Sequence, residues 1–299
     1  MITANVFDIK RFSINDGDGI RTTIFIKTCP LRCKWCQNPE GLIPEIRLWY
    51  AKNLCVACKS CIAACEFGAL DWDALGVRID HDACTRCGAC VTACPTGAIR
   101  FDARQMSVEE TLLEIEKDRP FYGTDGGVTL SGGECMASPA FSLAVLRECR
   151  ARGINAQIET SLYARPEVAD AFCEATDRII TDIKLIDPAR HRAATGVDNA
   201  PILENIRRLA KKGAALLIRV PLIPGFTDDG ENIDGIAKFV ASLGRRDIPV
   251  ELLNFNPMCR EKYESLRQEY PFDPDQREIP EDTVRALKEI LTGYGLTAL

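Results

Sequence analysis

Apolar positions along this chain of 299 residues follow two alternating spacings. Runs of β-branched and apolar residues predict buried strands, and apolar residues three or four positions apart predict amphipathic helices. One helix opens with a capping box formed by Ser107 and Glu110. The predicted strands are 20–28, 126–133, 154–160, 178–185, 215–223 and 249–255, and the predicted helices are 107–118, 138–152, 166–175, 201–212, 231–243 and 281–292.

Strands that alternate with helices over short connections predict an α/β fold with a parallel sheet. Six strands are fewer than the eight of a closed barrel, so we expect a partial (β/α)6 barrel, with a doubly wound sheet as the alternative. Both folds bind ligands at the carboxyl ends of their strands. The residues in that position are cysteine or mostly polar: Cys29 to Cys36, Ser131-Gly132-Gly133-Glu134, Glu159-Thr160, Asp182-Ile183-Lys184, Arg219 and Asn256.

Fifteen cysteines are unusual, and eleven of them fall between residues 29 and 94. The first residues, MITANVFDIKRFS, lack the apolar core of a signal peptide, and no apolar stretch reaches the ~20 residues of a membrane span. We therefore expect a cytoplasmic protein whose thiolates bind metal, with no membrane partner. The net charge of −6 argues against a nucleic-acid partner.

Two segments, 55–65 and 84–94, repeat the spacing C-x2-C-x2-C-x3-C of bacterial ferredoxins. In that pattern the fourth cysteine of each run binds the other [4Fe–4S] cluster. Zinc is the alternative metal for the C-x2-C pairs. The repeat predicts an electron-carrying insert at 47–104 within a discontinuous domain formed by 1–46 and 105–299. One cluster is expected on Cys55, Cys58, Cys61 and Cys94, and the other on Cys84, Cys87, Cys90 and Cys65.

A third cysteine motif, C-x3-C-x2-C, follows the first predicted strand and contains Cys29, Cys33 and Cys36. Its three thiolates lie close together in the sequence without a fourth nearby, so a cluster held here keeps one iron open for a ligand. The alternative is a zinc site completed by a distant cysteine such as Cys135 or Cys259.

The stretches CPLRCKWCQNPEG and SGGE, with the paired ferredoxin runs, resemble the glycyl radical enzyme activating enzymes. These are relatives of pyruvate formate-lyase activase within the radical S-adenosylmethionine (SAM) superfamily. The resemblance covers nearly the whole chain, from DGDGIRTTIFIKTCPLRCKWCQNPEG through DRPFYGTDGGVTLSGGE and TDIKL to NPMCREKYESL. It implies a partial radical SAM barrel with a two-cluster insert, three [4Fe–4S] clusters in all, and SAM chelated to the open iron of the cluster on Cys29, Cys33 and Cys36.

The resemblance also implies a set of SAM-binding residues. Gly132-Gly133-Glu134 would hold the methionine amino group, the backbone at Trp35, Cys36 and Gln37 would face the adenine, and Asp182-Ile183-Lys184 would contact SAM. Asn256 falls at the adenosine end, where many relatives carry a histidine. Glu159, Thr160 and Asp182 would hold a monovalent cation.

The residues alone leave other interpretations open for four of the residues that follow the predicted strands. Glu134 would also suit the start of a helix as an acidic residue. Asp182 and Lys184 would also form a structural ion pair, and Arg219 an ion pair inside the barrel.

The reaction that the resemblance implies is reductive cleavage of SAM to a 5′-deoxyadenosyl radical, which abstracts hydrogen from a backbone glycine of a partner glycyl radical enzyme. The insert would pass in the electron, from a donor such as flavodoxin or ferredoxin, and the chain would act as a monomer. The alternatives are a radical SAM enzyme that acts on a small molecule and a ferredoxin-type electron-transfer protein.

Overall fold

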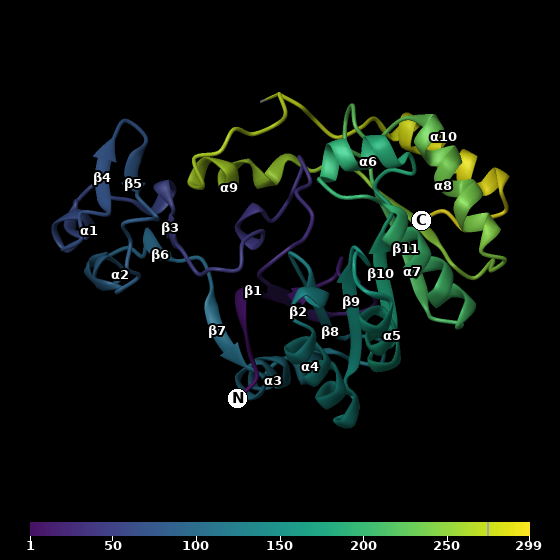
Figure 1. Cartoon of the computed structure of the whole chain (residues 1–299), viewed down its shortest axis with the longest axis horizontal. Helices are drawn as coiled ribbons and strands as arrows, with labels where there is room; N and C mark the ends of the chain where they lie inside the picture. The colour runs from purple at the N-terminus through teal and green to yellow at the C-terminus, as the bar shows by residue number, and fades with distance from the viewer. Residues whose placement is uncertain (274) are drawn as a thin grey trace.

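The computed structural model describes residues 1–273 and 275–299, which form an eight-stranded sheet with helices and a separate cysteine-rich lobe (Figure 1). The strand order is β12-β11-β10-β9-β8-β2-β1-β7. Six neighbouring strands are parallel: β2 (Arg21–Ile26), β8 (Gly127–Gly132), β9 (Asn155–Thr160), β10 (Arg178–Asp182), β11 (Leu216–Pro221) and β12 (Val250–Leu253). They are the six predicted strands, and they lie in chain order. A doubly wound sheet reverses its strand order, so that alternative is wrong.

Two strands that the hydrophobic pattern did not reveal extend the sheet. β1 (Thr3–Ser13) pairs antiparallel with β2 on one side and with β7 (Arg104–Ser107) on the other. β1 alternates buried and partly exposed positions, as an antiparallel strand with one solvated face does. The register pairs Arg104 with Val6, so the main sheet resumes at the last residue of the predicted insert.

The predicted helices all form, within one or two residues of their expected bounds. At the start of α3, Ser107 accepts a hydrogen bond from the Glu110 N–H and donates its own N–H to the Glu110 carboxylate, which confirms the capping box. One unpredicted helix, α6, precedes α7, and a short one, α9, follows β12. The bounds are α3 (Val108–Glu116), α4 (Pro139–Ala151), α5 (Pro166–Ala175), α6 (Pro188–Thr195), α7 (Ala200–Lys211), α8 (Gly230–Ser242), α9 (Arg260–Ser265) and α10 (Glu281–Gly293).

One hydrophobic core joins the sheet to these helices. Side chains of the strands, such as Ile24 and Leu130, share it with side chains of the helices, such as Phe172 and Leu209. Among the described residues, no helix is both long enough and apolar enough to cross a membrane.

The cysteine-rich lobe, called the insert below, runs between β2 and β7 and has a small core of its own. Each of its two halves contains a short helix, which the sequence analysis did not predict. A buried ion pair between Lys27, just after β2, and Asp102 joins its base to the main sheet at 2.6 Å. The boundaries at 47 and 104 stay a prediction. The elements inside them are β3 (Leu48–Tyr50) paired with β6 (Ile99–Phe101), the hairpin β4 (Leu70–Asp73) and β5 (Gly76–Ile79), α1 (Ser60–Ala63) and α2 (Ala89–Ala93).

Candidate active site

A cavity of about 570 Å³ opens at the carboxyl ends of the parallel strands. Its size lies within the range of small-molecule sites. Residues from separate strand ends meet there, as the topology requires. The predicted residues that line it are Cys29, Cys33, Trp35, Cys36, Gln37, Gly132, Gly133, Glu159, Thr160, Asp182, Lys184, Arg219 and Asn256.

The loop that carries the three cysteines is fixed to α6. The N–H groups of Arg32 and Lys34 donate to the carbonyls of Thr195 and Ala194 at 2.7 and 3.0 Å. Burial raises the pKa of Cys36 to about 12. Metal binding deprotonates such thiols, so a cationic cluster bound here would compensate for their buried charge.

Trp35 and Gln37 flank Cys36 in different surroundings. Trp35 is buried and packs against Phe226, with ring centroids 5.2 Å apart. Gln37 donates its side-chain amide to the carbonyl of Asn256 at 3.2 Å. The Asn256 side chain accepts from the N–H of Met258, so it caps the turn that leads to α9. The structure therefore brings Gln37 and Asn256 together at one rim of the cavity.

Gly132 and Gly133 let β8 approach the cysteine loop closely. Gly132 has a φ of 120°, and a Cβ there would lie 2.3 Å from the backbone nitrogen of Ile26. A Cβ on Gly133 would lie 2.6 Å from the carbonyl oxygen of Thr28. Only glycine fits at both positions, and the bare backbone is left facing the cavity.

Glu134 does not line the cavity with its neighbours. Its side chain is buried, and it accepts four hydrogen bonds from N–H and O–H donors and a longer one, at 3.8 Å, from the Cys135 thiol. One carboxylate oxygen accepts from the Met136 N–H (3.1 Å) and the Thr160 hydroxyl (2.7 Å), and the other from the N–H (2.8 Å) and hydroxyl (2.6 Å) of Ser161. The structure thus favours the helix-start interpretation, since Glu134 caps a short turn and joins the ends of β8 and β9.

Four charged residues of the cavity form ion pairs. Lys184 contacts Asp182 at 2.5 Å, which is the ion pair that the residues alone allowed. Arg219 pairs with Glu159 and, at 2.6 Å, with Glu251.

Side-chain oxygens of Glu159, Thr160 and Asp182, which were expected to bind a monovalent cation, are already bonded to other groups of the protein. The second carboxylate oxygen of Glu159 accepts from Ser131 at 2.7 Å, and the Thr160 hydroxyl donates to Glu134. Burial raises the pKa of Glu159, while the guanidinium of Arg219 opposes that rise. Ile183, between the two charged residues of its motif, lies in the hydrophobic core instead of the cavity.

The loop between β1 and β2 supplies cavity residues that sequence reasoning missed. Asn15 and Asp16 line the floor, where the Asn15 carbonyl accepts from Arg219 at 2.8 Å. The Asp16 carboxylate accepts from the hydroxyl of Thr23 at 2.7 Å. The only sequence signal was the turn-forming stretch DGDG that follows Asn15.

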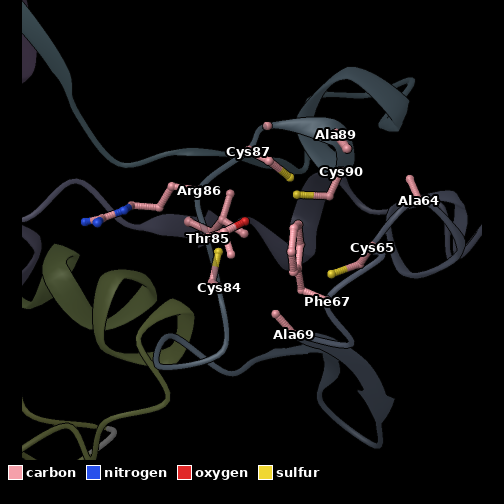
Figure 2. Close-up of a pocket in the computed structure, with 12 residues that line it drawn as sticks. Ala64, Cys65, Phe67, Ala69, Cys84, Thr85, Arg86, Cys87, Ala89 and Cys90 are labelled. Carbon is pink, nitrogen blue, oxygen red and sulfur yellow. The ribbon is translucent and has the colours of Figure 1, made fainter.

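In the insert, a small cavity is lined by four of the predicted cysteines, Cys65, Cys84, Cys87 and Cys90. Figure 2 shows their sulfur atoms around the ring of Phe67. Cys65 comes from the first sequence run and the other three from the second, which is the exchange that the ferredoxin pattern predicts.

The remaining four insert cysteines belong to the other predicted set. Burial raises the pKa of Cys61, and the neighbouring thiols of Cys94 and Cys55 add to that rise, so the three lie within electrostatic range of one another. Hydrogen bonds with Ser60 lower the pKa of the exposed Cys58, and the Cys94 thiol opposes that fall, so Cys58 also lies within electrostatic range of Cys94. Across residues 1–273 and 275–299, no three Cys, His, Asp or Glu side chains converge as a single metal ion would require. A four-iron cluster differs, because its cysteines bind separate irons.

The consecutive parallel strands and the three-cysteine loop at their carboxyl ends define a class of enzyme with a partial α/β barrel. The Radical SAM superfamily model matches residues 23–239. The crystal structure of a domain of pyruvate-formate lyase-activating enzyme from Bacteroides vulgatus aligns with a TM-score of 0.50 at 33% identity, and covers 58% of this chain and 98% of that domain.

The relatives narrow the class further. The (2S)-3-sulfopropanediol sulfolyase activating enzyme of Bilophila wadsworthia is 43% identical over 277 residues, covering 91% of each chain. The choline trimethylamine-lyase activating enzyme of Oleidesulfovibrio alaskensis is 38% identical over 276 residues, covering 90% of this chain and 89% of that one. The trans-4-hydroxy-L-proline dehydratase activating enzyme of Clostridioides difficile is 39% identical and covers 91% of each. The chain belongs to the glycyl radical enzyme activating enzymes of the radical SAM superfamily.

Proposed function

We propose that this enzyme activates a partner glycyl radical enzyme by installing a radical on a backbone glycine of that partner. The observation that carries the proposal is the composition of the cavity. Of its described lining residues three are cysteines, Cys29, Cys33 and Cys36, and Gly132 and Gly133 line the same cavity. Three thiolates hold a [4Fe–4S] cluster with one open iron. SAM bound at that iron supplies, on one-electron reduction, the 5′-deoxyadenosyl radical that takes hydrogen from the glycine.

The chain's own residues would bind and orient SAM. The backbone at Gly132 and Gly133 would receive the methionine amino group, and Glu134 would hold that backbone in place from outside the cavity. The ion pair of Lys184 with Asp182 would lie beside the methionine end, and the rim formed by Gln37 and Asn256 would receive the adenosine. The buried Trp35 would exclude water from the cluster loop.

Two further [4Fe–4S] clusters in the insert would deliver the electron, one on Cys55, Cys58, Cys61 and Cys94 and one on Cys65, Cys84, Cys87 and Cys90. The cavity lined by the second set supports this part of the proposal. The electron would come from flavodoxin or ferredoxin, and the enzyme would act in the cytoplasm as a monomer. The partner would belong to the lyases and dehydratases named for the relatives. The oxygens of Glu159 and Thr160 are already engaged, so the proposed site holds no monovalent cation.

An anaerobic experiment tests the proposal. Reconstituted enzyme is mixed with dithionite, SAM and a candidate glycyl radical enzyme, and electron paramagnetic resonance (EPR) is used to look for a glycyl radical. The radical is expected with wild-type enzyme and lost with Cys33→Ala. Cleavage of SAM without a radical on any partner would favour the small-molecule alternative. No SAM cleavage at all would favour the electron-transfer protein.

A further inference from the structure

The short helix α9 is fixed to the loop that carries the active-site cysteines. The hydroxyl of Tyr263 donates to the carbonyl of Cys36 at 3.0 Å. Lys262, the preceding residue, contacts Asn38 at 2.8 Å and Glu40 at 2.6 Å. Both attachments lie within four residues of Cys36, so the position of α9 follows that of the cysteine loop.

Arg267, two residues after the end of α9, is bonded to the insert. Its guanidinium makes a bidentate pair with Asp73, at 2.6 and 3.0 Å. It also donates to the carbonyls of Val77 (3.1 Å) and Gly76 (3.4 Å). A planar guanidinium forms such a set of bonds, and a lysine cannot reproduce it. The four bonds cover the tip of the β4–β5 hairpin and join it to the main domain.

The backbone of Arg267 is in a conformation that favours glycine. Its φ is 54°, in the left-handed region. The Gln268 N–H bonds the Tyr263 carbonyl at 2.9 Å, and the Arg267 N–H bonds the Glu264 carbonyl at 3.0 Å. These bonds form a Schellman motif, in which the left-handed position is usually glycine. An arginine is strained there, so a glycine at this position would keep the turn, and the backbone does not require the arginine side chain.

The hairpin tip leads on to one of the predicted cluster ligands. A Cβ on Gly76 would lie 2.3 Å from the hydroxyl of Tyr50, so the tip and that ring are in direct contact. Burial raises the pKa of the Tyr50 hydroxyl to about 12, and the neighbouring Cys55 thiol adds to that rise, so Cys55 lies beside Tyr50. Contacts therefore run without a break from Cys36 through α9, Arg267 and the hairpin to Cys55.

We propose that Arg267 is a positioning residue and that α9 with Arg267 is a strut between the two lobes. The strut fixes the distance from the insert to the cluster on Cys29, Cys33 and Cys36, and so sets the rate of electron delivery. This inference rests on the proposed function. A one-electron donor of the flavodoxin class is oxidised, an insert cluster is reduced, and the same electron passes to the active-site cluster without a bond or proton moving.

Arg267→Gly tests the strut, because it removes the guanidinium and relieves the backbone strain. SAM cleavage is measured with reduced flavodoxin and, separately, with dithionite, which is small enough to reduce the active-site cluster itself. We expect the flavodoxin-driven rate to fall several-fold, because electron transfer between two clusters slows as the distance between them grows. The dithionite-driven rate should not change. Asp73→Asn should act like Arg267→Gly, and Arg267→Lys should restore part of the rate.

Asp71→Asn is the matched control, because Asp71 lies on the same hairpin but pairs with Arg78 and not with Arg267. Iron content is measured in every variant. Pulsed EPR on the reduced enzyme should show a broader distribution of dipolar couplings between insert and active-site clusters in Arg267→Gly. Wild-type couplings and wild-type flavodoxin rates in both Arg267→Gly and Asp73→Asn would overturn the strut. If wild-type enzyme cleaves no SAM even with dithionite, the proposed function fails, and the couplings alone then decide whether the strut exists.

Discussion

Glu134 offers the sharpest test of how the glycine motif works, because its side chain has two competing roles. A direct contact with SAM would need a carboxylate oxygen that faces the cavity. In the structure the two oxygens accept four hydrogen bonds from the N–H and O–H groups of Met136, Thr160 and Ser161, and one oxygen also accepts from the Cys135 thiol. We therefore predict that Glu134→Gln acts first on stability and only then on SAM binding.

The magnitude follows from the four hydrogen bonds. The glutamine oxygen can keep two of them, for example those from Met136 and Thr160. Its amide group then faces Ser161, whose hydroxyl can rotate to accept while its N–H cannot. One orphaned buried N–H costs about 1–3 kcal/mol, and the surviving bonds lose the strength of a charged acceptor. The expected loss of unfolding free energy is about 2–4 kcal/mol, a large part of the total stability of a domain.

The assay compares stability and SAM affinity in the same preparations. Denaturant midpoints of the cluster-free proteins report stability, and the EPR change of the reduced cluster on titration with SAM reports affinity. Ser161→Ala is the control, because it removes one hydroxyl but leaves the N–H bonded to Glu134. We expect it to cost less than Glu134→Gln. Unchanged stability in Glu134→Gln, with much weaker SAM binding, would refute the argument and place the carboxylate on SAM.

Three further predictions concern buried charges and thiols. Lys27→Met should lower the unfolding free energy by about 3–5 kcal/mol, because the Asp102 carboxylate stays buried without its partner. The denaturant midpoint measures this loss. Adding Asp102→Asn to the same variant should recover part of it. Arg219→Met should make SAM binding depend on K⁺ or Na⁺, because Glu159 loses the guanidinium with which it pairs. SAM titrations with and without these ions test this. SAM binding to the wild-type enzyme should respond to neither ion. Cys84→Ala should remove about four irons per chain, measured chemically, if one insert cluster is lost.

The parallel strands could be predicted because strands buried on both faces are continuous apolar runs. The strand β1 and the helix α6 could not. β1 mixes charged and apolar residues along one antiparallel strand. The sequence of α6, PARHRAAT, has almost no apolar stripe, and its buried positions are His191, Ala194 and Thr195. That helix forms because Asp187 caps it and because its end receives the cysteine loop.

Within the site, the cysteines could be predicted because their spacing is local, whereas side-chain partners could not. Glu134 accepts a hydrogen bond from Thr160, which is 26 positions away in the sequence, and Arg219 pairs with Glu159, which is 60 positions away. A motif fixes which residue follows a strand, but packing between strands decides where its side chain points. That is why the glycines of the SGGE motif face the cavity as expected while its glutamate turns into the protein.

The partners of Glu159 also bear on the expected cation. The side chain of a glutamate is one methylene longer than that of an aspartate. The longer side chain at 159 reaches the guanidinium of Arg219, which a second carboxylate, Glu251, holds in place at 2.6 Å. A K⁺ or Na⁺ ion would have to displace the Arg219 guanidinium, whose position is set by two carboxylates and the Asn15 carbonyl. The internal guanidinium therefore has the advantage of preorganisation, which is the physical basis for expecting SAM binding to be indifferent to K⁺ and Na⁺.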